Sequence, residues 1–151
     1  MREALFSILV SVEGARVLDL FAGSGALGIE ALSRGAADAA FVDSSAAAIT
    51  AVRRNLHELG IDAEVRRQSA SAFLGGARDD ARQYDLVFLD PPYRHATTLG
   101  RELSTALAPV LAPGARVVTE SDRRAPLELE GLERLDERRY GDTLIRIYGT
   151  R

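Results

Sequence analysis

Apolar residues recur along the chain with two different periods, and these periods predict its secondary structure. Short, nearly continuous apolar runs such as residues 84–89 are typical of strands that are buried in a parallel sheet. Apolar residues three and four positions apart, such as Ile49, Val52 and Leu56, predict amphipathic helices. We therefore expect strands at residues 16–21, 39–43, 63–66, 84–89 and 115–120, and helices at residues 1–9, 26–32, 46–59, 70–81 and 97–111.

Capping and turn-forming residues mark the ends of these elements. Ser44 or Ser45 can cap the third helix, and Gly60 follows its last apolar residue. Glycines at residues 75–76 can interrupt the fourth helix, and the Pro-Gly pair at residues 113–114 predicts a turn before the fifth strand.

The order of the elements predicts an α/β fold. Strands and helices alternate with short links, which favours an open, mostly parallel sheet with right-handed crossovers. The tail differs, because residues 132–140 and 143–148 read as two strands joined through Gly141 and Asp142, a hairpin at one edge of the sheet. No linker or internal repeat divides the chain, so residues 1–151 are expected to form one domain.

Composition excludes several classes of chemistry. The chain of 151 residues contains no Cys, and all 19 of its Lys and Arg residues are Arg. Disulfides, thiolate nucleophiles, Schiff bases and a P-loop lysine are therefore excluded, and two histidines predict no metal site. No apolar run reaches the ~20 residues that cross a membrane, and no leader pattern is present, so a cytoplasmic protein without a membrane partner is expected. The net charge of −3 counts mildly against a nucleic-acid substrate.

A glycine loop follows the first predicted strand. Residues 19–25 read Asp-Leu-Phe-Ala-Gly-Ser-Gly, and Asp43 ends the next strand, where its carboxylate can accept both hydroxyl hydrogens of a ribose. Residues 23–28 also satisfy G-x-G-x-x-G, so the loop alone does not separate NAD from S-adenosylmethionine (SAM). The form D-x-F-x-G-x-G is similar to the nucleoside-binding loop of class I methyltransferases.

The tetrapeptide Asp-Pro-Pro-Tyr at residues 90–93 follows the fourth predicted strand and points to methyl transfer. An exocyclic amino group is a poor nucleophile because its lone pair is delocalised into the ring. The Asp90 carboxylate and the Pro91 carbonyl oxygen can accept its two hydrogens and direct the lone pair toward a methyl donor. Tyr93 offers a ring on which a base can stack. A Pro-Pro pair that only ends a strand is the structural alternative.

Four segments together resemble the bacterial small-subunit (16S) ribosomal RNA guanine-N2 methyltransferases: residues 2–6, 19–25, 90–93 and 140–143. The resemblance spans essentially the whole chain. It implies the Rossmann-like fold of class I SAM-dependent methyltransferases, with a seven-stranded sheet whose last strand is antiparallel. It also implies methyl transfer to a guanine of ribosomal RNA, either free or in an assembling small subunit.

The resemblance also implies the residues of the site. SAM would be bound by Asp19, Phe21, Ala22, Gly23, Ser24, Gly25, Asp43, Ser44, Ser69 and Ala70. The guanine amino group would be held by Asp90, Pro91, Pro92 and Tyr93. The family usually has Asn or Asp at the position of Ser69, and usually carries a basic β-hairpin and an Arg-Pro-Thr segment ahead of the Arg-Glu-Ala start. This sequence has no such segment before Arg2, which lowers its expected affinity for RNA.

Other functions remain open at this point. DNA adenine-N6 methyltransferases share Asp-Pro-Pro-Tyr, and protein glutamine-N5 methyltransferases usually have Asn in place of the Asp. An NAD-linked oxidoreductase and a non-catalytic domain of the same fold are more distant alternatives. Arg94 and His95 follow the tetrapeptide directly, where contacts with RNA phosphates are expected. We expect a monomer without a bound metal.

Overall fold

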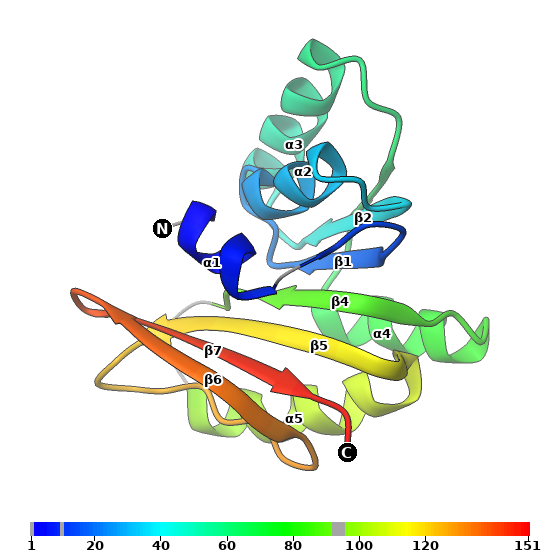
Figure 1. Ribbon diagram of the computed structural model, residues 1–151. Helices are drawn as coiled ribbons and strands as arrows, with labels where there is room; N and C mark the ends of the chain where they lie inside the picture. Colours follow the sequence, from blue (N-terminus) through cyan, green and yellow to red (C-terminus); the bar gives the residue numbers. More distant parts are fainter. Residues whose placement is uncertain (1, 10, 92–95) are drawn as a thin grey trace.

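A seven-stranded sheet with helices on both faces forms the frame of the protein (Figure 1). The computed structural model describes residues 2–9, 11–91 and 96–151. The strand order is β3-β2-β1-β4-β5-β7-β6. The strands are β1 (Arg16–Leu20), β2 (Asp38–Asp43), β3 (Glu64–Arg67), β4 (Tyr84–Leu89), β5 (Leu111–Asp122), β6 (Glu133–Tyr140) and β7 (Thr143–Gly149).

Two hydrophobic layers hold the helices on the sheet. The helices are α1 (Arg2–Leu9), α2 (Ala26–Ser33), α3 (Ala46–Glu58), α4 (Ala70–Asp79) and α5 (Ala96–Leu107), and α5 is followed by a 3-10 turn, η1 (Ala108–Val110). Successive strand residues point to opposite faces, so Phe88 packs with α1, α2 and α3 while Val87 packs with α4 and α5.

The topology determines where a ligand can bind. Strands β1 to β5 run parallel, and the chain order reverses between β1 and β4. Loops that leave the carboxyl ends of β1 and β4 diverge, which opens a crevice at that point of the sheet. The antiparallel pair β7 and β6 extends the sheet beyond β5.

The observed fold confirms the class predicted from the sequence, including the closing hairpin. The boundaries predicted between residues 107 and 115 are wrong, since the helix expected to reach residue 111 ends at Leu107. Pro109 lies in the 3-10 turn that follows, and β5 already begins at Leu111, so Pro113 and Gly114 lie within that strand. The glycines at residues 75–76 do not interrupt α4.

Two negative findings apply to the described ranges. None of the helices there is long and apolar enough to cross a bilayer. No group of three or more His, Asp or Glu side chains in those ranges could hold a metal ion.

Candidate active site

A cavity of about 270 Å³ lies beyond the carboxyl ends of β1, β4 and β5. Its described lining residues are Asp19, Phe21, Ala22, Gly23, Ser24, Ala26, Leu27, Asp90 and Glu120. The cavity therefore brings most of the predicted glycine loop together with the first residue of the Asp-Pro-Pro-Tyr segment.

The glycine loop has a tight conformation that its residues permit. Gly23 and Gly25 have positive φ angles of 59° and 80°, a region that glycine enters without steric cost. Phe21 also has a positive φ, 59°, which is uncommon for a residue with a side chain and often marks a functional turn. The Asn55 side chain on α3 donates to the Ser24 carbonyl oxygen at 2.9 Å and holds the loop against the helix.

Asp43 connects the glycine loop to the end of β2. One of its carboxylate oxygens accepts from the Gly23 backbone N at 3.0 Å, and the other accepts from the Ser45 backbone N at 2.9 Å. Asp43 therefore lies next to the glycine loop, where it was expected to bind a ribose. Ser44 is exposed beside it and does not line the cavity.

Asp19 is the most deeply buried acid of the cavity, with 3% of its surface exposed. Its Oδ2 accepts a hydrogen bond from the Gly28 backbone N, at 3.0 Å, in the first turn of α2. Burial raises the pKa of Asp19 to about 8, and the negative charges of Asp90 and Asp43 add to the rise. A cation in the cavity would stabilise the ionised form of this side chain.

Asp90 and Pro91 follow β4 directly and begin the predicted catalytic segment. Solvent still reaches the Asp90 carboxyl group, but the surrounding protein desolvates it. That desolvation and the negative charge of Glu120 raise the pKa of Asp90 to about 6. Pro91 is buried. The other predicted catalytic residues, Pro92 and Tyr93, lie outside the described residues, as do Arg94 and His95.

Glu120 lines the same cavity and was not predicted from the sequence. It lies near the end of β5, and the pairing of Leu89 with Thr119 places it beside Asp90 on the neighbouring strand. Burial raises the pKa of Glu120. Its sequence signal is a single acid that ends an apolar run, which becomes informative only when β5 is known to pair with β4.

Two residues of the predicted SAM-binding set, Ser69 and Ala70, lie outside this cavity lining. Ser69 caps α4, because its hydroxyl oxygen accepts from the Ala72 backbone N at 3.2 Å. The Gln68 backbone N donates to the Asp43 carbonyl oxygen at 3.1 Å, which ties this segment to the end of β2. Ser69 therefore lies at the same edge of the sheet as Asp43.

A larger hollow of about 510 Å³ lies between α4 and α5. It is lined mainly by surface residues of those helices, including Arg78 and Arg101, and contains none of the predicted site residues. The cavity beyond β1, β4 and β5 is smaller, but it combines described residues of the glycine loop with Asp90.

The fold and the two motifs together define the class of the protein. A parallel sheet closed by an antiparallel hairpin, with a glycine loop after β1 and Asp-Pro-Pro after β4, is the architecture of class I SAM-dependent methyltransferases. The chain belongs to the family described as conserved hypothetical protein 95, whose family model matches residues 1–149.

Known proteins support this placement. YlbH of Bacillus subtilis (strain 168), a candidate rRNA methyltransferase, is 36% identical over 100% of this chain and 85% of its own length. Ribosomal RNA small subunit methyltransferase D of Haemophilus influenzae is 33% identical over 98% of this chain and 79% of its own length. The resemblance to the small-subunit ribosomal RNA methyltransferases is thereby confirmed.

Solved structures agree with the fold. A conserved hypothetical protein of Streptococcus pyogenes has a TM-score of 0.84 and 34% identity, over 100% of this chain and 96% of its own. SMU.776, a candidate methyltransferase complexed with SAH, has a TM-score of 0.75, over 91% of this chain and 46% of its own. At 16% identity the second likeness supports the fold alone.

Proposed function

We propose that this protein transfers a methyl group from SAM to the exocyclic N2 amino group of a guanine in 16S ribosomal RNA. The charge of the cavity carries the proposal. Asp90 and Glu120 line it, Asp19 lies beside them and would ionise when a cation binds, and no basic side chain lines it in the part of the chain that the structure describes. SAM, when bound, supplies an electrophilic methyl group on a positively charged sulfonium. A cavity with this charge favours a cation.

The same charge disfavours NAD, whose pyrophosphate is an anion. Dinucleotide-binding folds leave the backbone N–H groups at a helix N-terminus free for the pyrophosphate. Here the Gly28 N–H, in the first turn of α2, is already bound by the Asp19 carboxylate. A pyrophosphate in that position would meet a buried acid.

The described residues fit the nucleoside part of SAM. Asp43 lies at the end of β2 and can accept the hydrogens of ribose hydroxyl groups while it holds the Gly23 backbone N. A Cβ atom built on Gly23 meets nothing within 4 Å, so the loop leaves space on that side. Ser44, Ser69 and Ala70 complete the proposed cofactor site along the same edge.

Asp90 and Pro91 are proposed to hold the acceptor. The Asp90 carboxylate and the Pro91 carbonyl oxygen accept the two amino hydrogens, which turns the nitrogen lone pair toward the methyl group. A pKa of about 6 leaves Asp90 mostly ionised at neutral pH, yet basic enough to take the proton released on methylation. Pro92 and Tyr93 are proposed to stiffen the segment and to stack on the base.

The choice of ribosomal RNA is supported by the names of relatives, including the small subunit methyltransferase D of Haemophilus influenzae. DNA adenine and protein glutamine remain the alternative acceptors. The test is transfer of labelled methyl from SAM to small ribosomal subunits, free small-subunit RNA, DNA and total protein, followed by nucleoside analysis.

We expect N2-methylguanosine in the small-subunit RNA with the wild-type protein and none with Asp90→Ala. SAM binding, measured by calorimetry, should persist in this variant, because Asp43 and the glycine loop are unchanged. Label in DNA or in protein instead of RNA would overturn the rRNA assignment, and a protein that binds NAD but not SAM would overturn the whole proposal.

A further inference from the structure

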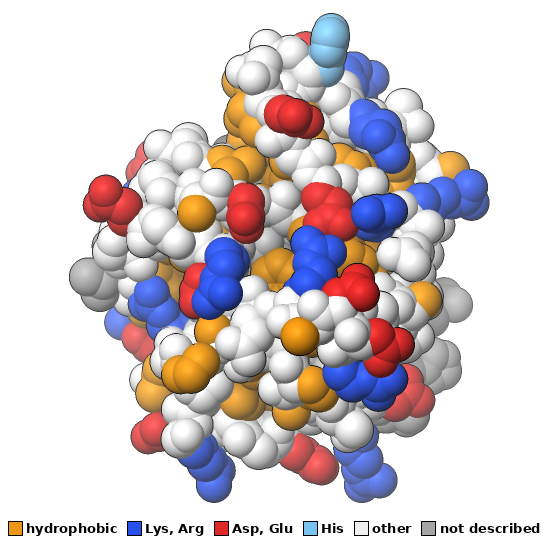
Figure 2. Space-filling model, turned by 90° about the vertical axis from the view of Figure 1, so that its right-hand side faces the viewer, with side chains coloured by type: hydrophobic (Ala, Val, Ile, Leu, Met, Phe, Trp, Pro, Cys, Tyr) orange, Lys and Arg blue, Asp and Glu red, His pale blue; other side chains and the backbone are white. Residues whose placement is uncertain are grey.

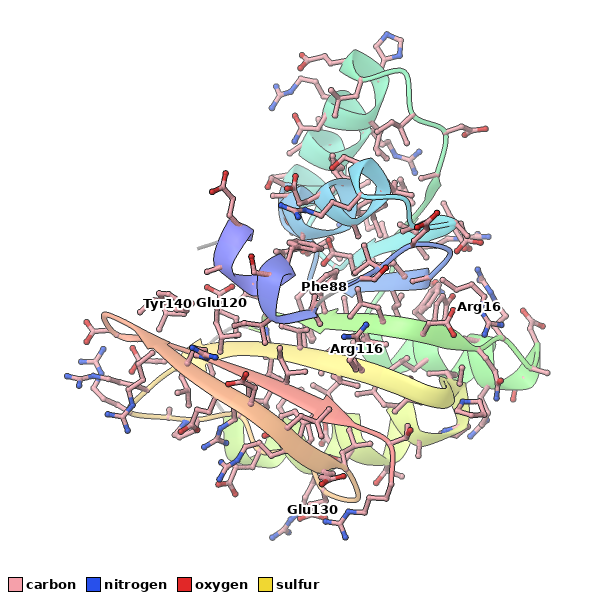
Figure 3. The ribbon with its side chains drawn as sticks, viewed as in Figure 1. Arg16, Phe88, Arg116, Glu120, Glu130 and Tyr140 are labelled. Carbon is pink, nitrogen blue, oxygen red and sulfur yellow. The ribbon has the colours of Figure 1, made fainter. Side chains whose placement is uncertain are left out.

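Strand β5 brings Glu120 to the cavity from the position next to β4. Parallel neighbours lie about 4.8 Å apart, and the register pairs Leu89 with Thr119, so Asp90 and Glu120 leave adjacent strands at the same level. Figure 3 labels Glu120 near the carboxyl end of β5. Two carboxylates therefore face the place where an acceptor amino group would lie.

Nothing in the described structure explains Glu120 as a stabilising residue. Its side chain forms no hydrogen bond or ion pair with the described residues, and it is half-buried beside another acid. Asp122, two residues further along the same strand, is instead paired with Arg124 at 2.7 Å. Partly buried like charges are unfavourable unless hydrogen-bond donors face them, which indicates that a ligand supplies those donors.

The candidate methyl acceptors differ in the group that lies beside the amino nitrogen. In adenine and cytosine, the ring nitrogen beside the amino group carries a lone pair and accepts hydrogen bonds. In a glutamine side chain, the group beside the amide nitrogen is a carbonyl oxygen, which is again an acceptor. Only guanine places a ring N–H donor, N1–H, beside its amino group on the same edge. Adjacent donors match adjacent carboxylates.

We propose that Glu120 is the residue that selects guanine, by accepting the N1–H hydrogen of the base whose amino group Asp90 holds. This inference rests on the proposed function and deepens it. An ionised Glu120 would repel the N1 lone pair of adenine, so the residue both attracts the correct base and rejects the wrong one.

The test changes N1 of the base from a hydrogen-bond donor to an acceptor, and it changes the side chain at position 120 from an acceptor to a group that can also donate. The target nucleotide is first mapped with the wild-type protein. Small-subunit RNA is then ligated around a synthetic fragment that carries either guanine or 2-aminopurine there. It is used free or in the subunit, whichever form the wild-type protein methylates. 2-Aminopurine keeps the amino group, but its N1 accepts a hydrogen bond. The variants are Glu120→Gln, whose amide can donate to N1, and Glu58→Gln, which alters an exposed acid on α3 as the matched control.

With the wild-type protein and Glu58→Gln, kcat/KM for guanine should exceed that for 2-aminopurine by about 100-fold or more. In Glu120→Gln, kcat/KM for guanine should fall about 10- to 100-fold, and the preference for guanine should shrink at least about tenfold. The SAM dissociation constant should rise by less than about tenfold, because Asp90 and the glycine loop still line the cavity. A merely structural role of Glu120 would lower both rates together.

Two failures are distinguishable. If the wild-type protein methylates guanine and Glu120→Gln keeps the full preference over 2-aminopurine, the role of Glu120 is overturned while the proposed function stands. If the wild-type protein forms no N2-methylguanosine in small-subunit RNA, the proposed function is overturned and the role of Glu120 with it. A Glu120→Gln protein that no longer binds SAM would likewise overturn the role, because it would place Glu120 in the cofactor site.

Discussion

At the amino ends of β1 and β4, an aspartate meets an arginine: Asp85 accepts from the Arg16 backbone N at 2.8 Å and from the Arg16 Nε at 2.9 Å. Near the carboxyl ends of the same two strands, Asp19 and Asp90 line the cavity beside Glu120, and none of the three pairs with an arginine in residues 2–9, 11–91 and 96–151. Figure 2 shows the side on which the amino ends lie, where acidic and basic side chains are interspersed.

The two ends of the sheet shift carboxyl pKa values in opposite directions. Hydrogen bonds from arginine side chains lower the pKa of Asp85 and of Glu64. Burial raises the pKa of Asp19 to about 8 and that of Asp90 to about 6. Asp85 and Glu64 at the amino end are paired with arginines, whereas the three acids of the cavity have no such partner among the described residues, and this difference supports the proposed site at the carboxyl end.

The largest expected effect comes from removing one charge at each end of the sheet. Asp90→Asn keeps the shape of the side chain but offers one acceptor oxygen instead of a carboxylate. Methyl transfer should fall about 10²–10³-fold, as in other enzymes that lose one preorganised polar group. Asp85→Asn, the same exchange at the amino end of β4, should leave the rate unchanged. Steady-state methyl transfer to small subunits measures both.

The pH profile offers an internal control on this result. Because the pKa of Asp90 is raised to about 6, the carboxyl group is protonated below that pH and loses its capacity as an acceptor. The wild-type rate should fall about tenfold for each pH unit below 6. A wild-type rate that stays constant down to pH 5 would mean that Asp90 does not act in its ionised form.

Asp19→Asn should change the pH dependence of stability. The pKa of Asp19 is higher in the folded protein than in the unfolded chain, so the folded state is stabilised below pH 4 and loses that contribution as the pH rises toward 8. Between pH 5 and 7 the loss is about 3 kcal/mol, at 1.36 kcal/mol per unit. An Asn can still accept from the Gly28 backbone N, but it never ionises.

Urea unfolding from pH 5 to 8 measures this difference. The stability of Asp19→Asn should decline less with pH than that of the wild-type protein, and the exposed control Asp38→Asn should keep the wild-type slope. If the unfolding free energy of all three proteins declined equally with pH, the pKa of Asp19 would not be raised in the folded protein.

Gly28→Ala tests how tightly the site end of the sheet is packed. A Cβ atom at Gly28 would lie 2.4 Å from Phe41 Cε1 and 3.1 Å from Asp19 Oδ2, so the helix or the ring must move. We expect a loss of about 2 kcal/mol in the free energy of unfolding. Gly76→Ala in α4 meets nothing within 4 Å and should instead gain about 0.5–1 kcal/mol. Equal effects of the two exchanges would contradict the crowding at Gly28.

Much of the site could be predicted from the sequence because strand ends carry it. Once β1, β2 and β4 are recognised as parallel neighbours, the glycine loop, Asp43 and Asp90 must emerge at the same edge. Sequence motifs are therefore enough to locate the predicted cofactor loop and the start of the proposed catalytic segment. The Asp90 pKa, by contrast, depends on desolvation and on Glu120, and these have no local pattern.

The missed features depend on contacts between segments far apart in the chain. Glu120 reads as an ordinary strand end until the register with β4 places it beside Asp90. The cap of α4 was also missed, because the Ser69 hydroxyl oxygen accepts from the Ala72 backbone N, and only the start of that helix shows it. The prediction makes helix α5 too long because Leu111 continues its apolar spacing. Pro109 has no backbone N–H and cannot continue the hydrogen bonds of the helix.

The smallest predicted effect tests the paired end of the sheet. Glu64, at the amino end of β3, accepts hydrogen bonds from the Arg82 side chain and from the Arg66 Nε at 3.0 Å. Glu64→Gln should cost about 1 kcal/mol of unfolding free energy, since partly exposed pairs contribute little, and methyl transfer should not change. Because the pKa of Glu64 is lowered in the folded protein, the ionised side chain stabilises the fold at a pH above the pKa of the unfolded chain. This contribution is lost as the pH falls, so the cost of the substitution should shrink in acid. Urea unfolding at pH 7 and pH 3 measures the cost of the substitution and its decrease in acid. A variant that loses methyl transfer without losing stability would abolish the distinction between the two ends.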